Sequence, residues 1–384
     1  MDRYKFDKGF ARFLQIFIAP FVKSRFNFKR EGRYKAPDEP FVLICNHVTN
    51  LDMIWVGDSF DKHMYYVASE HVVRGGLGGK VVNLLFKPIV REKATVGLST
   101  VVEMKNHLKA GHNVCIFAEG LRSANGTSNK IVESTGAVLK KLGATVVTFK
   151  LHGGFLTSPR WASDIRKGGM TGELVKVYSS EEISKMTPAQ INDALNSDIY
   201  EDAYEYNESR KIAYKSKKAA EGIEYELVVC PKCRKFATIH SRKSEFFCEC
   251  GLKGKYDEYG LLSGEGFDFT RLNEWDSWQK EYISNLPDID GEQVLVSHSD
   301  QILKQIVKGH DDVIADTGEI VLTNKSISVG NTTIPFENIR GSDIFFHGNI
   351  LLYTKDKKYY EIRNDKSKIP GYLYVLLMNR YGEV

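Results

Sequence analysis

Short apolar runs alternate with amphipathic stretches from residue 40 to about residue 180, and this alternation restricts the folds that the chain can adopt. Five runs have the length and apolar character of strands: FVLIC, MYYVA, NVCIFA, ATVVTFKL and ELVKVYS. The stretches TVGLSTVVEMKNHLKAG and ESTGAVLKKLGA between them have helical periodicity and end at Gly111 and Gly143. Such alternation predicts an α/β domain, with a mainly parallel sheet flanked by helices.

This domain is predicted to end with the helix that begins in TPAQINDAL, where Thr187 is a candidate N-cap and Gln190 would complete a capping box. The polar and basic residues 205–222 are expected to form a solvated connector or a surface helix. From about residue 318 onward, short alternating strands are separated by Asn, Gly and Lys turns, and the chain finishes in the amphipathic stretch GYLYVLLMNRY. This order of elements is similar to a small PH-like barrel.

A chain of 384 residues is long for a single hydrophobic core, so two or three domains are expected. The net charge is only +4, so any preference for anions must come from local patches. We predict an N-terminal membrane-interface region over residues 1–30, the α/β domain over 31–222, a zinc ribbon over 223–262, and a β-rich domain with a C-terminal helix over 263–384.

The N-terminal segment Phe10–Phe26 is apolar and aromatic, but Arg12 and Gln15 interrupt it and Pro20 breaks it. It lacks the cleavage site of a signal peptide, and no run of eighteen apolar residues exists in the chain, so neither a leader nor a spanning helix is expected. Two interpretations stay open. The segment either packs on the domain as a helix, or lies in a membrane interface with its basic residues near anionic headgroups.

The six cysteines divide into two kinds. Cys45 and Cys115 lie in apolar runs and are expected to be core residues. The other four form two close pairs: Cys230, Cys233, Cys248 and Cys250. This spacing matches a zinc ribbon, in which four thiolates leave no position for water, so the zinc should be structural. A redox motif and unligated thiols are the alternatives. No disulfide scaffold is indicated, which favours a reducing, cytosolic setting.

His47 and Asp52 follow the first predicted strand in FVLICNHVTNLDMIW. On one continuous helix, this spacing would place them about 140° apart, so they meet only if His47 stands in a turn and Asp52 in the first turn of the next helix. Thr49 is a candidate N-cap for that helix. The carboxylate could then fix the imidazole tautomer, and the other ring nitrogen could act as a general base. For this motif alone, the alternative is that Asp52 caps the helix and His47 fills a loop.

Further polar residues follow other strands at the same predicted edge of the sheet. The strand NVCIFA runs into a cluster that contains Glu119, Gly120, Arg122 and Ser123. Gly120 permits a tight turn, Arg122 offers a bidentate fork for phosphate, and Ser123 adds a hydroxyl donor. Arg91 follows another apolar segment, LLFKPIV. Residues beyond the carboxyl ends of parallel strands line the ligand crevice, so this cluster is a candidate substrate-binding site beside the His47–Asp52 pair.

The blocks NHVTNLD, FKPIVR and FAEGLRS, in this order and spacing, resemble the first three sequence blocks of the glycerolipid acyltransferase family, typified by 1-acylglycerol-3-phosphate acyltransferase. The resemblance covers roughly residues 10–205. It implies that His47 is a general base oriented by Asp52, and that Arg91, Glu119 and Arg122 help to hold the glycerol phosphate of the acceptor. It also implies that the N-terminal region seats the enzyme on the cytoplasmic side of a membrane as a peripheral protein.

Some positions depart from the family pattern. Thr49 stands where Ser is usual, Ala118 where Pro often precedes the Glu, and Leu121 where Thr is commonest. The Pro that is usual in a fourth block is missing from VVTFKLHGG. These departures leave the catalytic pair intact but change blocks that shape the acceptor pocket in the family.

The resemblance implies transfer of a fatty acyl group from acyl-CoA or acyl carrier protein to a lysophospholipid hydroxyl, first of all that of 1-acylglycerol-3-phosphate, giving phosphatidate. An activated thioester requires no covalent nucleophile and no catalytic metal, because positioning and a base suffice. The alternatives are another lipid or polar hydroxyl acceptor, a non-catalytic nucleic-acid-binding module, and a membrane adaptor that binds a protein partner through the ribbon or the C-terminal domain. Nucleic-acid binding is disfavoured, because the basic residues around the ribbon have little aromatic interleaving.

Overall fold

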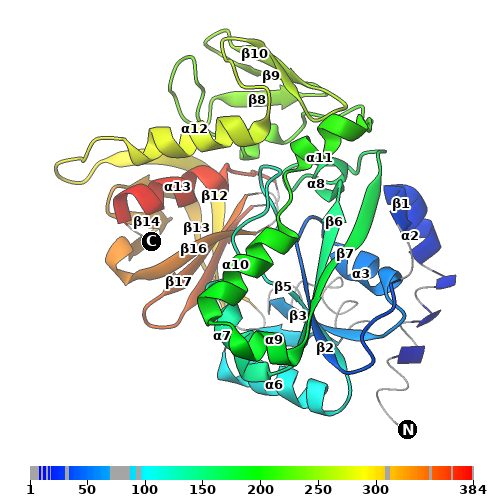
Figure 1. The fold of residues 1–384 in the computed structure, drawn as a ribbon. Helices are drawn as coiled ribbons and strands as arrows, with labels where there is room; N and C mark the ends of the chain where they lie inside the picture. The colour runs from blue at the N-terminus through cyan, green and yellow to red at the C-terminus, as the bar shows by residue number, and fades with distance from the viewer. Residues whose placement is uncertain are drawn as a thin grey trace. The chain divides into compact units, whose positions relative to one another are not determined.

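A computed structural model describes residues 8–9, 12–13, 16–17, 19–30, 34–69, 87–91, 97–307, 312–345, 348–364 and 366–382. The chain divides into two compact units (Figure 1). The first unit comprises Met1–Pro159 and Ile165–Lys215, and the second comprises Arg160–Asp164 and Ser216–Val384. The finer division into four regions, at residues 30, 222 and 262, stays a prediction.

The first unit is built on a seven-stranded sheet. Its strands are β1 (Phe28–Arg30), β2 (Phe41–Cys45), β3 (Met64–Ser69), β4 (Ile89–Arg91), β5 (Asn113–Phe117), β6 (Thr145–His152) and β7 (Met170–Tyr178). They lie in the order β1-β7-β6-β2-β5-β3-β4. Only β6 and β7 pair in the antiparallel sense, and the other neighbours are parallel. The mainly parallel sheet and all five predicted strands are therefore confirmed.

Helices accompany this sheet along the chain (Figure 1). They are α2 (Ala19–Phe26), α3 (Asp52–Ser59), α6 (Leu98–Lys109), α7 (Thr135–Leu142), α8 (Gly154–Thr157), α9 (Ser180–Lys185), α10 (Pro188–Ile199) and α11 (Ala203–Arg210). Alternate residues of β2 enter two different cores, because successive side chains of a strand point to opposite faces. Ile44 packs in one core with Leu195 of α10, and Leu43 packs in the other with Trp55 of α3. The strand is buried on both faces, which explains its continuous apolar run.

The predicted end of α7 and the predicted start of α10 agree with the structure. Gly143 closes α7 in the left-handed conformation, with φ 63°, and its N–H donates to the Leu139 carbonyl. Thr187 and Gln190 form the predicted capping box at the start of α10. Cys45 and Cys115 are fully buried core residues, as expected.

The segment 205–222 is more tightly packed than the solvated connector that its polar composition predicted. Tyr214 is 1% exposed, and its hydroxyl donates to the Gly169 carbonyl over 3.0 Å. A Cβ on Gly168 would come within 2.0 Å of the Tyr214 ring, so the glycine makes room for this aromatic side chain. The packing of one tyrosine against glycine backbone leaves no periodic signal in the sequence.

The second unit contains two antiparallel sheets. The smaller sheet consists of β8 (Ile239–Arg242), β9 (Glu245–Cys248), β10 (Lys253–Tyr256) and β11 (Leu262–Glu265). The larger sheet consists of β12 (Val294–Ile306), β13 (Val313–Thr323), β14 (Ser326–Val329), β15 (Thr332–Pro335), β16 (Ile339–Phe345), β17 (Asn349–Thr354) and β18 (Tyr359–Arg363). Its first strand, β12, pairs with its last, β18, and helix α13 (Gly371–Gly382) follows. The predicted β-rich region with a C-terminal helix is confirmed.

The elements of this unit that the sequence does not predict include α12 (Leu272–Ser284) and the long strand β12. The pairing of β12 with β13 shifts register at several points, and such bulges break the period-two pattern by which strands are recognised. Val228 and Val229, just before the first cysteine pair, share a core with Leu303 of β12 and Ile283 of α12. The cysteine-bearing segment and the β-rich region are therefore packed around one core.

The N-terminal prediction falls partly outside the described residues, as does the stretch 84–86 that leads into and opens the second block. Among the described residues, four large apolar side chains of the N-terminal segment are at least half exposed: Phe13, Ile16, Phe17 and Phe21. In the part of the chain that the structure describes, no helix has the length and apolar character needed to cross a bilayer.

Candidate functional site

Asp52 opens helix α3, and its carboxylate folds back over the turn that precedes the helix. Oδ2 lies 2.7 Å from the His47 Nδ1 atom and accepts the Val48 N–H over 2.7 Å. Oδ1 accepts the Thr49 N–H over 2.9 Å and the Thr49 hydroxyl over 2.6 Å. The contact between imidazole and carboxylate that the sequence predicted is therefore present, across the junction of a turn and a helix.

This contact determines which nitrogen of His47 carries the proton. The carboxylate can only accept, so Nδ1 is the donor and Nε2 keeps its lone pair when the ring is neutral. The side chain of Asp52 is 1% exposed, whereas that of His47 is 25% exposed. The ring is thus anchored at its buried nitrogen and partly open to solvent, which is the arrangement that a general base requires.

The prediction that Thr49 is the N-cap of α3 is wrong. The N-cap is Leu51, without a side-chain cap. The Thr49 hydroxyl donates to Asp52 and accepts the Leu51 N–H and the Trp55 Nε1–H, each over 3.1 Å. Thr49 therefore holds the Asp52 carboxylate in place through its hydroxyl, which is itself fixed by the Leu51 and Trp55 donors.

The backbone of His47 is held on both sides by the third sequence block. Its N–H donates to Glu119 Oε1 over 2.8 Å, and its carbonyl accepts the Ser123 N–H over 3.1 Å. The imidazole also stacks on Phe117 at the end of β5, with ring centroids 4.8 Å apart and planes at 23°. The carboxyl ends of β2 and β5, which are parallel neighbours, thus meet at His47.

Glu119 is buried, and its second oxygen, Oε2, accepts the Asn129 N–H over 2.6 Å. Burial raises the pKa of Glu119 to about 8, although the two backbone amides favour the charged form. Both carboxylate oxygens are engaged by backbone, so in this structure Glu119 joins the first and third blocks. Contact of this carboxylate with an acceptor stays a prediction.

The other residues of the predicted substrate cluster also lie near His47. Arg122 donates from Nη1 to Asn50 Oδ1 over 2.9 Å and from Nη2 to the Ser158 carbonyl over 2.6 Å. Gly120 has φ 76°, and a Cβ placed on it would lie 3.8 Å from Arg91 Nη2, which brings the second block beside the third. The predicted residues are therefore brought together at one edge of the sheet.

Sequence reasoning missed Phe117 and Asn46 as parts of this site. Phe117 was assigned only to the strand, and its stacking on His47 depends on the pairing of β2 with β5, which the sequence does not reveal. Asn46 immediately precedes His47 and is fully buried, with its side chain hydrogen-bonded to the backbone of Leu151. The position of a polar residue, Asn46, directly after the apolar run FVLIC is the one feature of the sequence that could have indicated its role.

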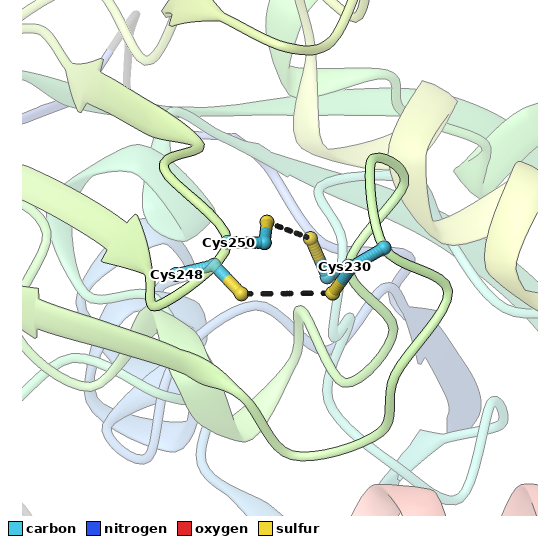
Figure 2. A group of neighbouring side chains, drawn as sticks. Cys230, Cys248 and Cys250 are labelled. Atoms are coloured by element: carbon cyan, nitrogen blue, oxygen red, sulfur yellow. Dashed lines mark hydrogen bonds between the residues drawn. The ribbon is translucent and has the colours of Figure 1, made fainter.

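The second candidate site is the cysteine cluster of the other unit (Figure 2). The four Sγ atoms, of Cys230, Cys233, Cys248 and Cys250, all lie within 4.8 Å of one another. Those of Cys230 and Cys250 are 3.6 Å apart, and those of Cys233 and Cys248 are 3.8 Å apart. Tetrahedral zinc with Zn–S bonds of 2.3 Å requires separations of about 3.8 Å, so these residues fit a four-thiolate metal site.

Comparison with known proteins identifies the class of the first unit. The family model Acyltransferase matches residues 27–151, which include all three sequence blocks. The chain therefore carries an acyltransferase domain, and the family resemblance drawn from those blocks is confirmed.

Comparison with individual proteins adds less. No curated protein sequence matches the chain. The crystal structure of the 1-acyl-sn-glycerophosphate (LPA) acyltransferase PlsC from Thermotoga maritima is 16% identical, covers 56% of this chain and 86% of its own, and superposes with a TM-score of 0.45. The C-terminal domain of an unknown protein from Leishmania infantum is 16% identical and covers 27% of this chain and 97% of its own, with a TM-score of 0.18. Neither likeness identifies a substrate.

The replacement Glu119→Gln should destabilise the first unit by about 1–3 kcal/mol, because the amide nitrogen cannot accept a hydrogen bond and one buried backbone N–H loses its partner. The raised pKa of Glu119 gives wild type a stabilising contribution that is complete below the ordinary carboxyl value and is lost as the pH rises to about 8. The deficit of the variant should therefore be largest in acid and narrow toward about pH 8.

Urea unfolding at a series of pH values measures this deficit. Glu181→Gln is the matched control, because the Glu181 side chain is 76% exposed, and it should leave the free energy of unfolding unchanged. A deficit that widens with rising pH would show that Glu119 is charged and stabilising throughout.

Proposed function

We propose that the protein is a peripheral membrane O-acyltransferase that moves a fatty acyl group from an acyl thioester to the hydroxyl of a lysophospholipid. The observation that carries this proposal is the 2.7 Å contact between His47 Nδ1 and Asp52, in a domain that matches the acyltransferase family. This contact leaves Nε2 of His47 as the base for the acceptor hydroxyl.

In the proposed reaction, His47 Nε2 removes the proton from the acceptor hydroxyl as its oxygen attacks the thioester carbonyl carbon. The imidazolium that forms is stabilised by Asp52, whose position is fixed by the amides of Val48 and Thr49. The tetrahedral intermediate collapses with cleavage of the C–S bond, and the departing thiolate takes the proton from His47. The products are an ester and a free thiol, and the base returns to its neutral form.

The acceptor is proposed to carry a phosphate, and lysophosphatidate is the first candidate. Arg122 bonds neutral oxygens of Asn50, Ser158 and Val48 in this structure. A phosphate is a stronger partner for a guanidinium than an amide or a carbonyl, so an anionic acceptor can compete for this side chain. Arg91 beside Gly120 supplies a second guanidinium, and Ser123 follows on the same turn. The acyl donor is proposed to be acyl-CoA or acyl carrier protein.

The N-terminal segment is proposed to lie on the cytoplasmic face of the membrane. Phe13, Ile16, Phe17 and Phe21 expose apolar surface within a segment that also carries basic residues, and this combination suits the interface between lipid chains and anionic headgroups. A lipid substrate could then reach the domain without leaving the bilayer surface.

The cysteine cluster is proposed to hold one structural zinc ion. A metal bound by four thiolates has no open position for water or substrate, so it would supply folding energy rather than chemistry. The Val229 carbonyl, next to Cys230, accepts the Trp275 Nε1–H of α12 over 3.0 Å, and Arg234 stacks on Trp278 with Cζ 4.8 Å from the ring centroid. Loss of the metal is therefore expected to loosen α12 and the core around it.

The replacement His47→Ala should lower acyl transfer by about 10²–10⁴-fold without unfolding the protein, since it removes the base but few packing contacts. Asp52→Asn should also lower the rate, because an amide favours the wrong imidazole tautomer. The measurement is incubation of labelled acyl thioester with a panel of lysolipids, followed by product analysis. His240→Ala is the control, since His240 is exposed in the other unit. Near-wild-type turnover in the His47 variant would remove the mechanism.

One equivalent of zinc should copurify with the protein, and Cys230→Ser with Cys233→Ser should abolish it, because two ligands cannot hold the ion in place of four. Elemental analysis measures the metal, and thermal unfolding of the second unit should shift to lower temperature in the variant. Cys115→Ala, outside the cluster, should retain the zinc. Fully folded wild-type protein without any bound metal would overturn this assignment.

A further inference from the structure

A second group of ionisable side chains lies next to Asn46, which opens the first sequence block, within the same unit. His152 ends strand β6, Glu173 lies on the neighbouring strand β7, and Glu201 follows helix α10. His152 Nε2 is 3.2 Å from Glu173 Oε1, and its Nδ1 is 3.5 Å from Glu201 Oε2. The proposed acyl transfer uses none of these three side chains.

Asn46 connects this group to the candidate base. Strand β2 pairs with β6 up to Cys45 and Phe149. Beyond that point the Asn46 side chain replaces the backbone, since its Oδ1 accepts the Leu151 N–H over 2.8 Å and its Nδ2 donates to the Leu151 carbonyl over 2.9 Å. The amide thereby extends the strand pairing to the residue immediately before His47. Its remaining N–H donates to Glu201 Oε2 over 3.3 Å.

Glu201 is held in place by backbone on several sides. Its Oε1 accepts the Gly153 N–H over 3.1 Å. Its own N–H donates to Ser128 Oγ over 3.0 Å, and its carbonyl accepts the Ser128 N–H over 2.9 Å. The carboxylate is buried, and a buried carboxylate is costly to ionise unless a cation or several donors compensate its charge.

His152 is placed to be that cation. Its side chain is 11% exposed, and its ring stacks on Tyr206 with centroids 4.4 Å apart and planes at 5°. Burial lowers the pKa of His152, but the nearby carboxylates of Glu201 and Glu173 outweigh burial, so the pKa lies above its ordinary value. The Nδ1 atom faces Glu201 as an ion pair at 3.5 Å without the geometry of a hydrogen bond, so the attraction is one of charge. The ionisable groups that contact His152 are Glu173 of β7, Glu201 after α10 and Tyr206 of α11. Arg210 lies over the Tyr206 ring, and Tyr214 and Cys45 interact electrostatically with Glu201.

We propose that His152 is a cationic positioning residue, which holds Glu201 in the orientation that fixes Asn46 and so orders the backbone that leads into His47. The chain of contacts runs from imidazolium to carboxylate, from carboxylate to amide, and from amide to the end of β2. Any effect of His152 on catalysis rests on the proposed acyl transfer. The effect of His152 on the order of the His47 backbone is independent of that proposal.

The raised pKa of His152 makes the folded state more stable when this side chain is protonated. The stabilising contribution of His152 is complete below its ordinary value of about 6.5 and is lost as the pH rises through the higher folded-state value. Deprotonation leaves Glu201 with neutral donors alone. The backbone before His47 should therefore become less ordered on the alkaline side.

The experiment compares full-length wild type with His152→Gln, which keeps a polar side chain but cannot become cationic. Ring spectra of histidine-labelled protein should show His152 titrating above about 6.5 in wild type, and a lower value in Glu201→Gln. The His47 ring signal should move as His152 titrates, and this coupled movement should vanish in His152→Gln. His240→Gln is the control and should leave both signals unchanged.

Steady-state kinetics provide the second readout. In His152→Gln, kcat should fall roughly 10-fold while the acceptor KM changes little, and the rate should lose the alkaline decline that belongs to His152. Glu173→Gln is a milder variant, because Glu173 is 43% exposed, and it should lower the titration point of His152 without unfolding the protein.

The possible results separate this inference from the proposed function. A His152 that titrates at or below its ordinary value, or a His47 signal that ignores the His152 titration, would overturn the positioning role. Absence of acyl transfer with every lysolipid, together with the predicted coupling of the two histidine signals, would overturn the proposed function and support the positioning role.

Discussion

The candidate active site depends on one buried carboxylate. Asp52 lies at the start of α3, where it accepts hydrogen bonds from the turn that carries His47, including the amides of Val48 and Thr49. The same carboxylate fixes the turn, the start of the helix and the tautomer of the imidazole. Because hydrogen bonds to a charged group are stronger than those between neutral groups, this single side chain can hold a short, otherwise irregular segment in one conformation.

The parallel sheet explains why distant residues support the same histidine. The carboxyl ends of β2, β5 and β6 lie side by side, so the residues that follow each strand reach the same region. Glu119 after β5 holds the His47 backbone, and Asn46 continues the pairing of β2 with β6 up to the base. Glu119 after β5 and Leu151 of β6 therefore hold His47 and the preceding Asn46 from either side of β2. These contacts fix the position of His47 more precisely than a free loop would.

The sequence predicted those parts of the fold that have a local cause. The strands, the closure of α7 at Gly143 and the capping box of Thr187 each follow from the periodicity or chemistry of neighbouring residues. The network of Asn46, His152 and Glu201 could not be predicted, because Asn46 lies 155 residues from Glu201 in the chain and the three side chains meet only after the sheet has formed. The prediction that Thr49 is an N-cap is wrong for a related reason. The Thr49 hydroxyl donates its hydrogen bond to the Asp52 carboxylate instead of capping the helix.

The most direct measurement concerns the proton on His47. Nitrogen chemical shifts of the ring, recorded on histidine-labelled protein in a pH range where the imidazole is neutral, distinguish the two tautomers. The structure predicts the proton on Nδ1, facing the carboxylate of Asp52, and a bare Nε2. A neutral ring protonated at Nε2 would contradict the account, because the nitrogen assigned as the base would then have no lone pair for the acceptor hydroxyl.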